Sequence, residues 1–141
     1  MRPIFVLILL SFLLIGCQDY GGERPAVVTN KTVFLLGEPI DVTISNETEP
    51  AIYLLNCCGS PEFHIDRRES ERWIQYDNHL IPCPLMCPGC QINVAISQPV
   101  QTNVGGNEIE QRGTYRLRFF FQRGEAEPGL SELTSNTFTV D

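Results

Sequence analysis

Ile40-Asp41-Val42-Thr43-Ile44-Ser45 is the stretch that decides the fold, because apolar and polar residues alternate strictly along it. A period of two places Ile40, Val42 and Ile44 on one face of a strand and their polar neighbours on the other. Turn-forming residues flank the stretch, with Gly37-Glu38-Pro39 before it and Asn46 directly after it. The sequence therefore predicts a half-buried β-strand over residues 40–46.

The same period recurs in both directions along the chain. Short apolar or alternating runs are separated by turns rich in Gly, Pro, Asn and charged residues, and none has convincing helical spacing. The runs at 63–66 and 73–76 flank a charged turn, Arg67 to Arg72, and are typical of a hairpin. The other predicted strands cover residues 32–36, 51–56, 92–96, 115–121 and 138–140. We therefore expect residues 26–141 to form an all-β, antiparallel β-sandwich of about seven to eight strands.

An irregular segment from Asp77 to Gly89 interrupts this pattern. It contains Pro82, Pro84 and Pro88, and proline does not suit a sheet interior because it lacks the backbone N–H. Three cysteines, Cys83, Cys87 and Cys90, lie within it or directly after it. We expect a long Cys- and Pro-rich loop here.

The first seventeen residues have a different character. An apolar run from Ile4 to Ile15 follows a single cation at Arg2, which is typical of a secretory signal peptide. As a helix, this run would be about 18 Å long, well short of a hydrocarbon core of about 30 Å, so it is not a membrane span. The run closes with Leu14-Ile15-Gly16-Cys17, which resembles the lipobox of bacterial lipoproteins. The resemblance implies cleavage between Gly16 and Cys17 and attachment of fatty acyl chains, such as palmitate, to Cys17.

This resemblance also suggests how the chain is organised and where it resides. Residues 1–16 would be the signal peptide, residues 17–25 a polar lipidated tether and residues 26–141 the folded domain. Gln18 stands where many enterobacterial lipoproteins retained at the inner membrane have Asp. We therefore expect a lipid-anchored protein of the cell envelope, at the outer membrane or cell surface rather than at the inner membrane.

Two further segments resemble bacterial immunoglobulin-like domains. Leu36 to Ile44 is similar to their opening strands, and Gly113-Thr114-Tyr115-Arg116-Leu117 is similar to the Gly-x-Tyr before their penultimate strand. The resemblance implies an immunoglobulin-like sandwich with Tyr115 as its tyrosine corner, the hydroxyl bonding backbone upstream. Neither strand 40–46 nor strand 115–121 contains a cysteine, so the inter-sheet disulfide of antibody domains is missing.

The charge balance argues against nucleic-acid binding. The chain has ten cationic and seventeen anionic residues, a net charge of −7. Arg67-Arg68 lies among carboxylates, so no basic stripe is present to follow a phosphate backbone. Loss of Arg2 with the signal peptide makes the mature chain more acidic still. We expect membrane attachment through the acyl chains rather than through attraction to anionic lipid headgroups.

Five cysteines remain besides Cys17, namely Cys57, Cys58, Cys83, Cys87 and Cys90. Export to an oxidising compartment makes disulfides the first expectation, although the odd number leaves one cysteine over and sequence does not choose the pairs. Adjacent cysteines form a strained ring when they pair with each other. We therefore predict at least one bridge from the first two cysteines to the last three.

The same residues allow a second interpretation, a metal site. Cys57, Cys83, Cys87 and Cys90 could bind zinc or copper(I) as thiolates, with His64 and His79 as further donors. A second CxxC to match Cys87-Pro88-Gly89-Cys90 is missing, which favours disulfides over metal. This CxxC also lacks the βαβ context of thiol–disulfide oxidoreductases.

We expect no enzymatic activity and no cofactor. The chain has only the two histidines, lacks a Gly-x-Ser-x-Gly motif and scatters its carboxylates over turns.

Exposed aromatic residues would indicate a binding surface instead. Tyr53, Trp73 and Tyr76 are either core aromatics or an exposed patch for a partner or a glycan. Alternation places Phe120 on the face opposite Phe119 and Phe121, so it meets either a covering segment or a partner.

These observations favour a non-enzymatic lipoprotein, in which a tethered immunoglobulin-like domain acts as a binding, adhesion or envelope-structural module for an unidentified protein partner. The alternative is an extracytoplasmic metal-binding protein that uses the Cys83–Cys90 loop. An inhibitor of a secreted protease is a third interpretation, for which no specific motif is present.

Overall fold

The computed structural model describes residues 24–57, 60–76, 91–95, 97–124 and 129–141. This part of the chain contains twelve strand segments and no helix. The segments are β1 (Ala26–Thr29), β2 (Val33–Phe34), β3 (Ile40–Ser45), β4 (Ile52–Cys57), β5 (Ser60–Pro61), β6 (Phe63–Glu69), β7 (Arg72–Gln75), β8 (Gln91–Val94), β9 (Val100–Val104), β10 (Gly113–Arg123), β11 (Ser131–Thr134) and β12 (Phe138–Val140).

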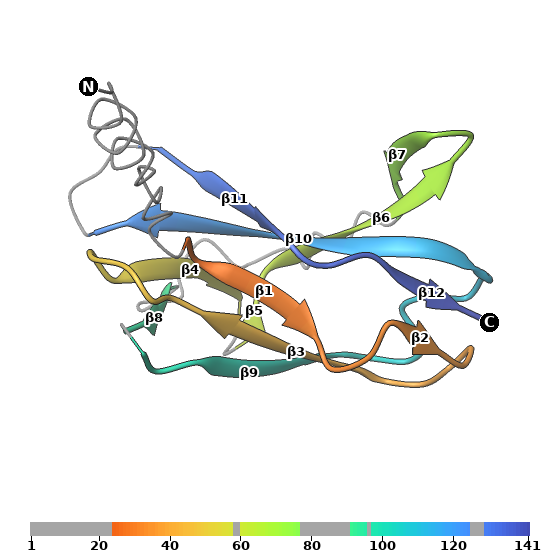
Figure 1. Ribbon diagram of the computed structural model, residues 1–141, viewed down its shortest axis with the longest axis horizontal. Coiled ribbons are helices and arrows are strands. Elements are labelled where there is room, and N and C mark those ends of the chain that lie inside the picture. Colours follow the sequence, from red (N-terminus) through yellow and green to blue (C-terminus); the bar gives the residue numbers. More distant parts are fainter. Residues whose placement is uncertain (1–23, 58–59, 77–90, 96, 125–128) are drawn as a thin grey trace, which may run out of the picture.

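The strands form two sheets that pack face to face as a sandwich (Figure 1). The smaller sheet has the order β1-β3-β9 and is antiparallel throughout. The larger, nine-stranded sheet is built around β10, which pairs with β4 and β6 and also with β11 and β12. The described chain is therefore an all-β, immunoglobulin-like sandwich, which confirms the predicted fold class.

Several of the twelve segments are pieces of one interrupted strand. β4 and β6 lie one after the other along the same edge of β10, with Leu54 opposite Phe121 and Phe63 opposite Phe119. β8 and β7 lie beside these two pieces in the same way. β1 and β2 divide the first strand between the sheets, and β11 and β12 share the other edge of β10. If each of these four pairs is counted as one interrupted strand, the described chain has seven strands, the other three being β3, β9 and β10. The two-residue β5 is additional.

The apolar residues of the alternating stretches form the core between the two sheets. Ile40, Val42 and Ile44 of β3 are buried, and so are the inward-facing residues of β10 from Tyr115 to Phe121. Each large aliphatic or aromatic side chain buried in this way contributes roughly 1.5–3 kcal/mol to stability. The core therefore carries the fold without an inter-sheet disulfide between β3 and β10, neither of which contains a cysteine.

Tyr115 forms the predicted tyrosine corner. Its side chain is fully buried, and its hydroxyl donates a hydrogen bond to the carbonyl oxygen of Gln111 at 2.7 Å. Its ring packs edge-on against Tyr76 and stacks with Phe138. Burial raises the pKa of the Tyr115 phenol, so the group stays a neutral hydrogen-bond donor.

Two strand boundaries differ from the sequence prediction: β2 ends before the predicted residue 36, and β6 extends past the predicted residue 66. β2 stops at Phe34 because the chain turns through Gly37, whose φ is +84°, and the N–H of Glu38 bonds the carbonyl of Leu35. β6 runs on to Glu69, so the charged turn between β6 and β7 contains only Ser70 and Glu71, both with positive φ.

Candidate functional site

Most residues predicted for signal cleavage, lipid attachment, disulfide bonds or metal binding lie outside the described part of the chain. These are Gly16, Cys17, Cys58, His79, Cys83, Cys87 and Cys90. Cys57 is the last residue of β4. Within the described ranges, no three His, Cys, Asp or Glu residues gather as a metal-binding group. The same ranges contain no helix long and apolar enough to cross a membrane.

The three aromatic residues considered as a patch do not form one surface. Tyr76 is partly buried, and its hydroxyl accepts a hydrogen bond from the N–H of Glu110 at 3.3 Å. Trp73 lies in β7, where the guanidinium of Arg116 stacks over its ring at 4.5 Å. Tyr53 lies in β4, opposite Gln122 of β10. The three residues therefore have separate environments, and Trp73 is the one whose ring packs against a charged side chain, that of Arg116.

Phe120 faces away from the core, as alternation predicts, and meets another ring of the same sheet. It packs edge-on against His64 of β6, with ring centroids 4.9 Å apart. Nδ1 of His64 is buried, and no described residue forms a hydrogen bond with it. His64 is thus a half-buried strand residue rather than a member of a catalytic set within the described chain.

A cluster of charged residues lies on the outer face of the large sheet, and we call it the Asp66 cluster. Asp66 of β6 is only 3% exposed although it points away from the core. Its Oδ2 atom lies 2.9 Å from Nε of Arg116 and 2.8 Å from Nε of Arg118. Arg118 also reaches Glu132 of β11 at 3.2 Å, and Arg116 covers Trp73. The cluster therefore ties four strands together across their outward face.

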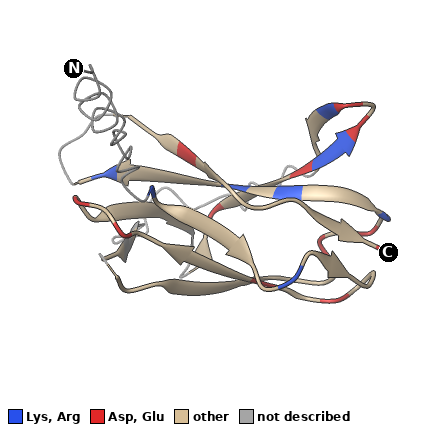
Figure 2. Cartoon of the chain, viewed as in Figure 1, with Lys and Arg blue, Asp and Glu red and all other residues tan. Residues whose placement is uncertain are grey.

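Strand pairing explains why these side chains meet. Asp66 lies directly opposite Arg116, and Arg118 lies opposite His64 on one side and Thr134 on the other. Cross-strand neighbours on one face are within side-chain reach, so both arginines converge on one carboxylate. In Figure 2, acidic residues on β6 are red and basic residues on the neighbouring part of β10 are blue. This cluster was not predicted from the sequence. The only signal was opposite charge at outward positions of two predicted strands.

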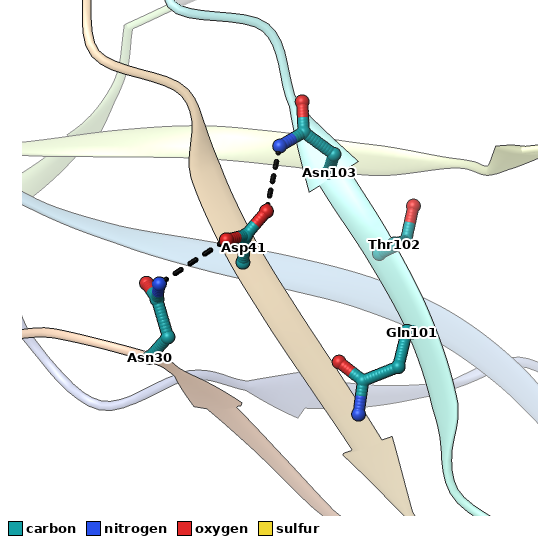
Figure 3. A pocket seen from close by; sticks show the side chains of 5 residues that line it. All are labelled: Asn30, Asp41, Gln101, Thr102 and Asn103. Atoms are coloured by element: carbon teal, nitrogen blue, oxygen red, sulfur yellow. Dashed lines mark hydrogen bonds between the residues drawn. The ribbon is translucent and has the colours of Figure 1, made fainter.

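A second polar feature lies on the outer face of the small sheet (Figure 3). A shallow hollow of about 480 Å³ is lined by Asn30, Asp41, Gln101, Thr102 and Asn103. The Asp41 carboxylate accepts hydrogen bonds from the amides of Asn103 at 2.9 Å and Asn30 at 3.2 Å. These bonds satisfy both carboxylate oxygens of Asp41 internally. None of the described residues that line the hollow is aromatic, so they offer no platform for a sugar ring.

The side chain of Glu38 closes the turn at the end of β2. Its carboxylate is paired with Lys31 and accepts a hydrogen bond from the N–H of Leu35 at 2.9 Å. The hydrogen bond from Lys31, followed by that from Leu35, lowers the pKa of Glu38 below its ordinary value. Glu38 therefore stays ionised in the folded protein under mildly acidic conditions.

Comparison with known proteins adds no relative from which a function could be transferred. No protein-family model matches the chain, and no curated protein matches it. Function must therefore be argued from the sequence motifs and from the geometry of the two outer faces.

Proposed function

We propose that this chain is a lipid-anchored, non-enzymatic module of the bacterial cell envelope. The observation that carries the proposal is the lipobox-like stretch Leu14-Ile15-Gly16-Cys17 shortly before a folded β-domain whose described part begins at Arg24. Cleavage before Cys17 would leave that cysteine as the first residue of the mature chain. Several acyl chains on one residue hold a protein firmly at a membrane, whereas a single chain binds only marginally.

The tether length limits how far the domain stands from the lipid. Seven residue steps separate Cys17 from Arg24, and even a fully extended chain spans only about 3.3–3.6 Å per residue. Arg24, two residues before β1, therefore lies within roughly 25 Å of the anchored cysteine. In Figure 1, β1 begins at one end of the sandwich and the β6–β7 hairpin projects from the other end. An anchor on this side directs the hairpin away from the membrane.

A domain held in this orientation suits binding or structural support better than catalysis. Its outer faces present arginine, tryptophan and amide side chains rather than a nucleophile with a base. Arginine and tryptophan are enriched at protein–protein interfaces and supply much of their binding energy. We place the protein at the outer membrane or cell surface because Gln18, rather than Asp, follows the anchored cysteine.

The test of anchoring is metabolic labelling with an alkyne-bearing palmitate in a bacterial host. The parent chain should be labelled, processed to the mature mass and recovered in membranes. Cys17→Ser should remain an unlabelled precursor, because no thiol is available for the diacylglyceryl group. Cys57→Ser is the matched control and should be labelled like the parent. Equal labelling of Cys17→Ser and the parent would refute the proposal.

One observation on the sheet supports proximity of the two groups of cysteines, which the disulfide prediction and the metal-binding alternative both require. Leu55, two residues before Cys57, lies opposite Gln91, which directly follows Cys90 in sequence. The described residues beside the two groups of cysteines are therefore neighbours. This supports the predicted bridge, which would close a loop of roughly 25–35 residues and contribute about 3–4 kcal/mol in the chain-entropy model.

Intact-mass measurement separates the two states of these cysteines. Each disulfide removes two hydrogen atoms from the mass, whereas a thiolate site retains a zinc or copper ion under native conditions. Peptide mapping without reductant should then find a bridge from Cys57 or Cys58 to Cys83, Cys87 or Cys90. Bridges confined to residues 83–90, or a bound metal ion, would contradict the disulfide prediction.

A further inference from the structure

The β6–β7 hairpin exposes a sheet edge that the rest of the described chain leaves open. β7 pairs with β6 on one side, and no described strand pairs with its other side. The hairpin also extends beyond the body of the sandwich (Figure 1). Open edges can accept a further strand, and proteins usually protect them.

Two other edges of this protein are closed by side chains. At β1, the N–H of Thr29 donates to Oδ1 of Asn136 at 2.8 Å. Just after β2, the N–H of Leu35 donates to the carboxylate of Glu38 at 2.9 Å. Both bonds occupy a donor that a further strand would need.

The hydrogen-bond pattern shows which groups of β7 face outward. The turn contains two residues, so Glu69 and Arg72 face each other, and the N–H of Tyr76 bonds the carbonyl of Ile65 at 2.8 Å. Because inward and outward groups alternate along an antiparallel strand, the N–H and C=O of Trp73 point to the open edge. Neither group has a hydrogen-bond partner within the described chain.

Apolar side chains lie on both faces of β7, next to this open edge. Ile74 is 47% exposed on one face of β7. Trp73 lies on the other face, partly covered by Arg116. A strand added here would cover apolar surface on both faces while it bonded the backbone.

We propose that β7 pairs antiparallel with β7 of a second copy of this chain, about a two-fold axis at Trp73. In this arrangement the two Trp73 residues lie opposite each other and exchange both outward hydrogen bonds. Ile74 of each copy lies opposite Arg72 of the other copy. The two Trp73 side chains meet on one face, and the two Ile74 side chains become diagonal neighbours on the other face.

Charge favours a second copy at this edge over other parts of the surface. The chain carries a net charge of −7, so most encounters between two copies bring like charges together. The hairpin is locally neutral, because three arginines balance three carboxylates: Arg67, Arg68 and Arg72 against Asp66, Glu69 and Glu71. Two copies can therefore meet at the hairpin without this repulsion.

The edge is short, so the pairing would be weak between free molecules, and the inference rests on the proposed anchoring to supply proximity. Attachment of both copies to one membrane raises their effective concentration without a new contact. The hairpins stand at the end of the domain away from the start of β1, where neighbouring anchored copies can reach each other.

The experiment uses the full lipidated chain in its own membrane, with a photoreactive benzoylphenylalanine in place of Ile74. Two differently tagged copies should crosslink to each other and give a species of twice the mass that carries both tags. The same probe at Leu130, which is 54% exposed but far from the hairpin in sequence, should give no such species. A crosslink only to other proteins, or none, would overturn the proposal.

Two variants test whether backbone pairing is responsible. Trp73→Pro removes the outward N–H, which the fold does not use, and an edge strand tolerates proline at such a position. It should lower the crosslink about tenfold, because two symmetry-related hydrogen bonds are lost at once. Trp73→Thr truncates the side chain but keeps the N–H, so it should retain most of the crosslink. Equal yields for the two variants would overturn the proposal.

Lipid labelling of the same samples tests the proposed anchoring separately from the proposed β7–β7 pairing. Labelled chains that form no homodimer would refute the pairing and leave the anchoring intact. Unlabelled chains that still form the homodimer would refute the anchoring and support the pairing.

Discussion

Asp66→Ala should destabilise the domain by about 2–3 kcal/mol, because it leaves two arginines without their shared partner. Removal of one partner from a buried ion pair usually costs about 3–5 kcal/mol. The lower value applies because the Arg116 and Arg118 side chains remain 27% and 19% exposed, so water can solvate them in part. Arg118 also keeps Glu132, and Arg116 keeps Trp73.

Urea unfolding of the soluble chain from Gln18 onward, followed by circular dichroism, measures this loss. For a domain of this size, about 2–3 kcal/mol corresponds to a fall of roughly 10 °C in the melting temperature. Asp41→Ala is the matched control, since this exposed carboxylate on the other sheet also bonds two side chains. It should cost less than about 0.5 kcal/mol, as surface substitutions usually do.

A double-mutant cycle tests whether the loss comes from the ion pairs. Arg118→Met keeps much of the apolar stem and removes the charge. Combined with Asp66→Ala, it should show a coupling energy of about 1–2 kcal/mol, because the two side chains are in contact. A loss below about 1 kcal/mol for Asp66→Ala alone, or strict additivity in the cycle, would refute the reasoning.

Three further predictions concern single residues. Tyr115→Phe should cost about 1 kcal/mol in urea unfolding, because it leaves a carbonyl oxygen without its buried donor; no measurable loss would contradict a structural tyrosine corner. Gly106→Ala should cost about 1–3 kcal/mol, since an added Cβ would lie 1.9 Å from the carbonyl oxygen of Gly37. Gly105→Ala is its control and should cost less, because the added Cβ meets mainly flexible side chains. Glu38→Gln should destabilise the domain at pH 7, and the difference should shrink as pH falls below about 4.5. The sign follows because a carboxyl whose pKa is lower in the folded state loses its stabilising contribution on protonation. A difference that is constant from pH 7 to pH 3 would refute it.

Strict alternation was sufficient to predict the strands that face the core directly. β3 and β10 lie where Ile40–Ser45 and the run from Tyr115 to Phe121 place them, and the tyrosine corner follows from the Gly-x-Tyr resemblance. β9 and β11 were missed for a physical reason. Val100–Val104 has polar residues at its three central positions, and Ser131–Thr134 contains Leu133 as its one buried side chain. Such strands are held by pairing with their neighbours, which a local pattern does not record.

The Asp66 cluster lay beyond sequence reasoning for a similar reason. An acidic residue at an outward strand position is normally exposed, whereas Asp66 is buried and two arginines of β10 lie against its carboxylate. The interruption of one strand into β4 and β6 is equally non-local, since it is visible only as pairing along one edge of β10. Signal cleavage and lipid attachment at Cys17 stay predictions from the sequence, because residues 1–23 lie outside the described chain.

The division of the first strand between the two sheets has a mechanical consequence. β1 begins at one end of the sandwich and runs antiparallel to β3, while the β6–β7 hairpin lies at the other end (Figure 1). Under the proposed anchoring and pairing, a pull between the anchor and a second copy held at the hairpin would act along the axis of β1. Such a force shears the β1–β3 hydrogen bonds together instead of opening them one by one. Two hydrogen bonds between Thr29 and Asn136, one donated by each residue, resist the same displacement. The force therefore acts in the direction in which the domain resists it best.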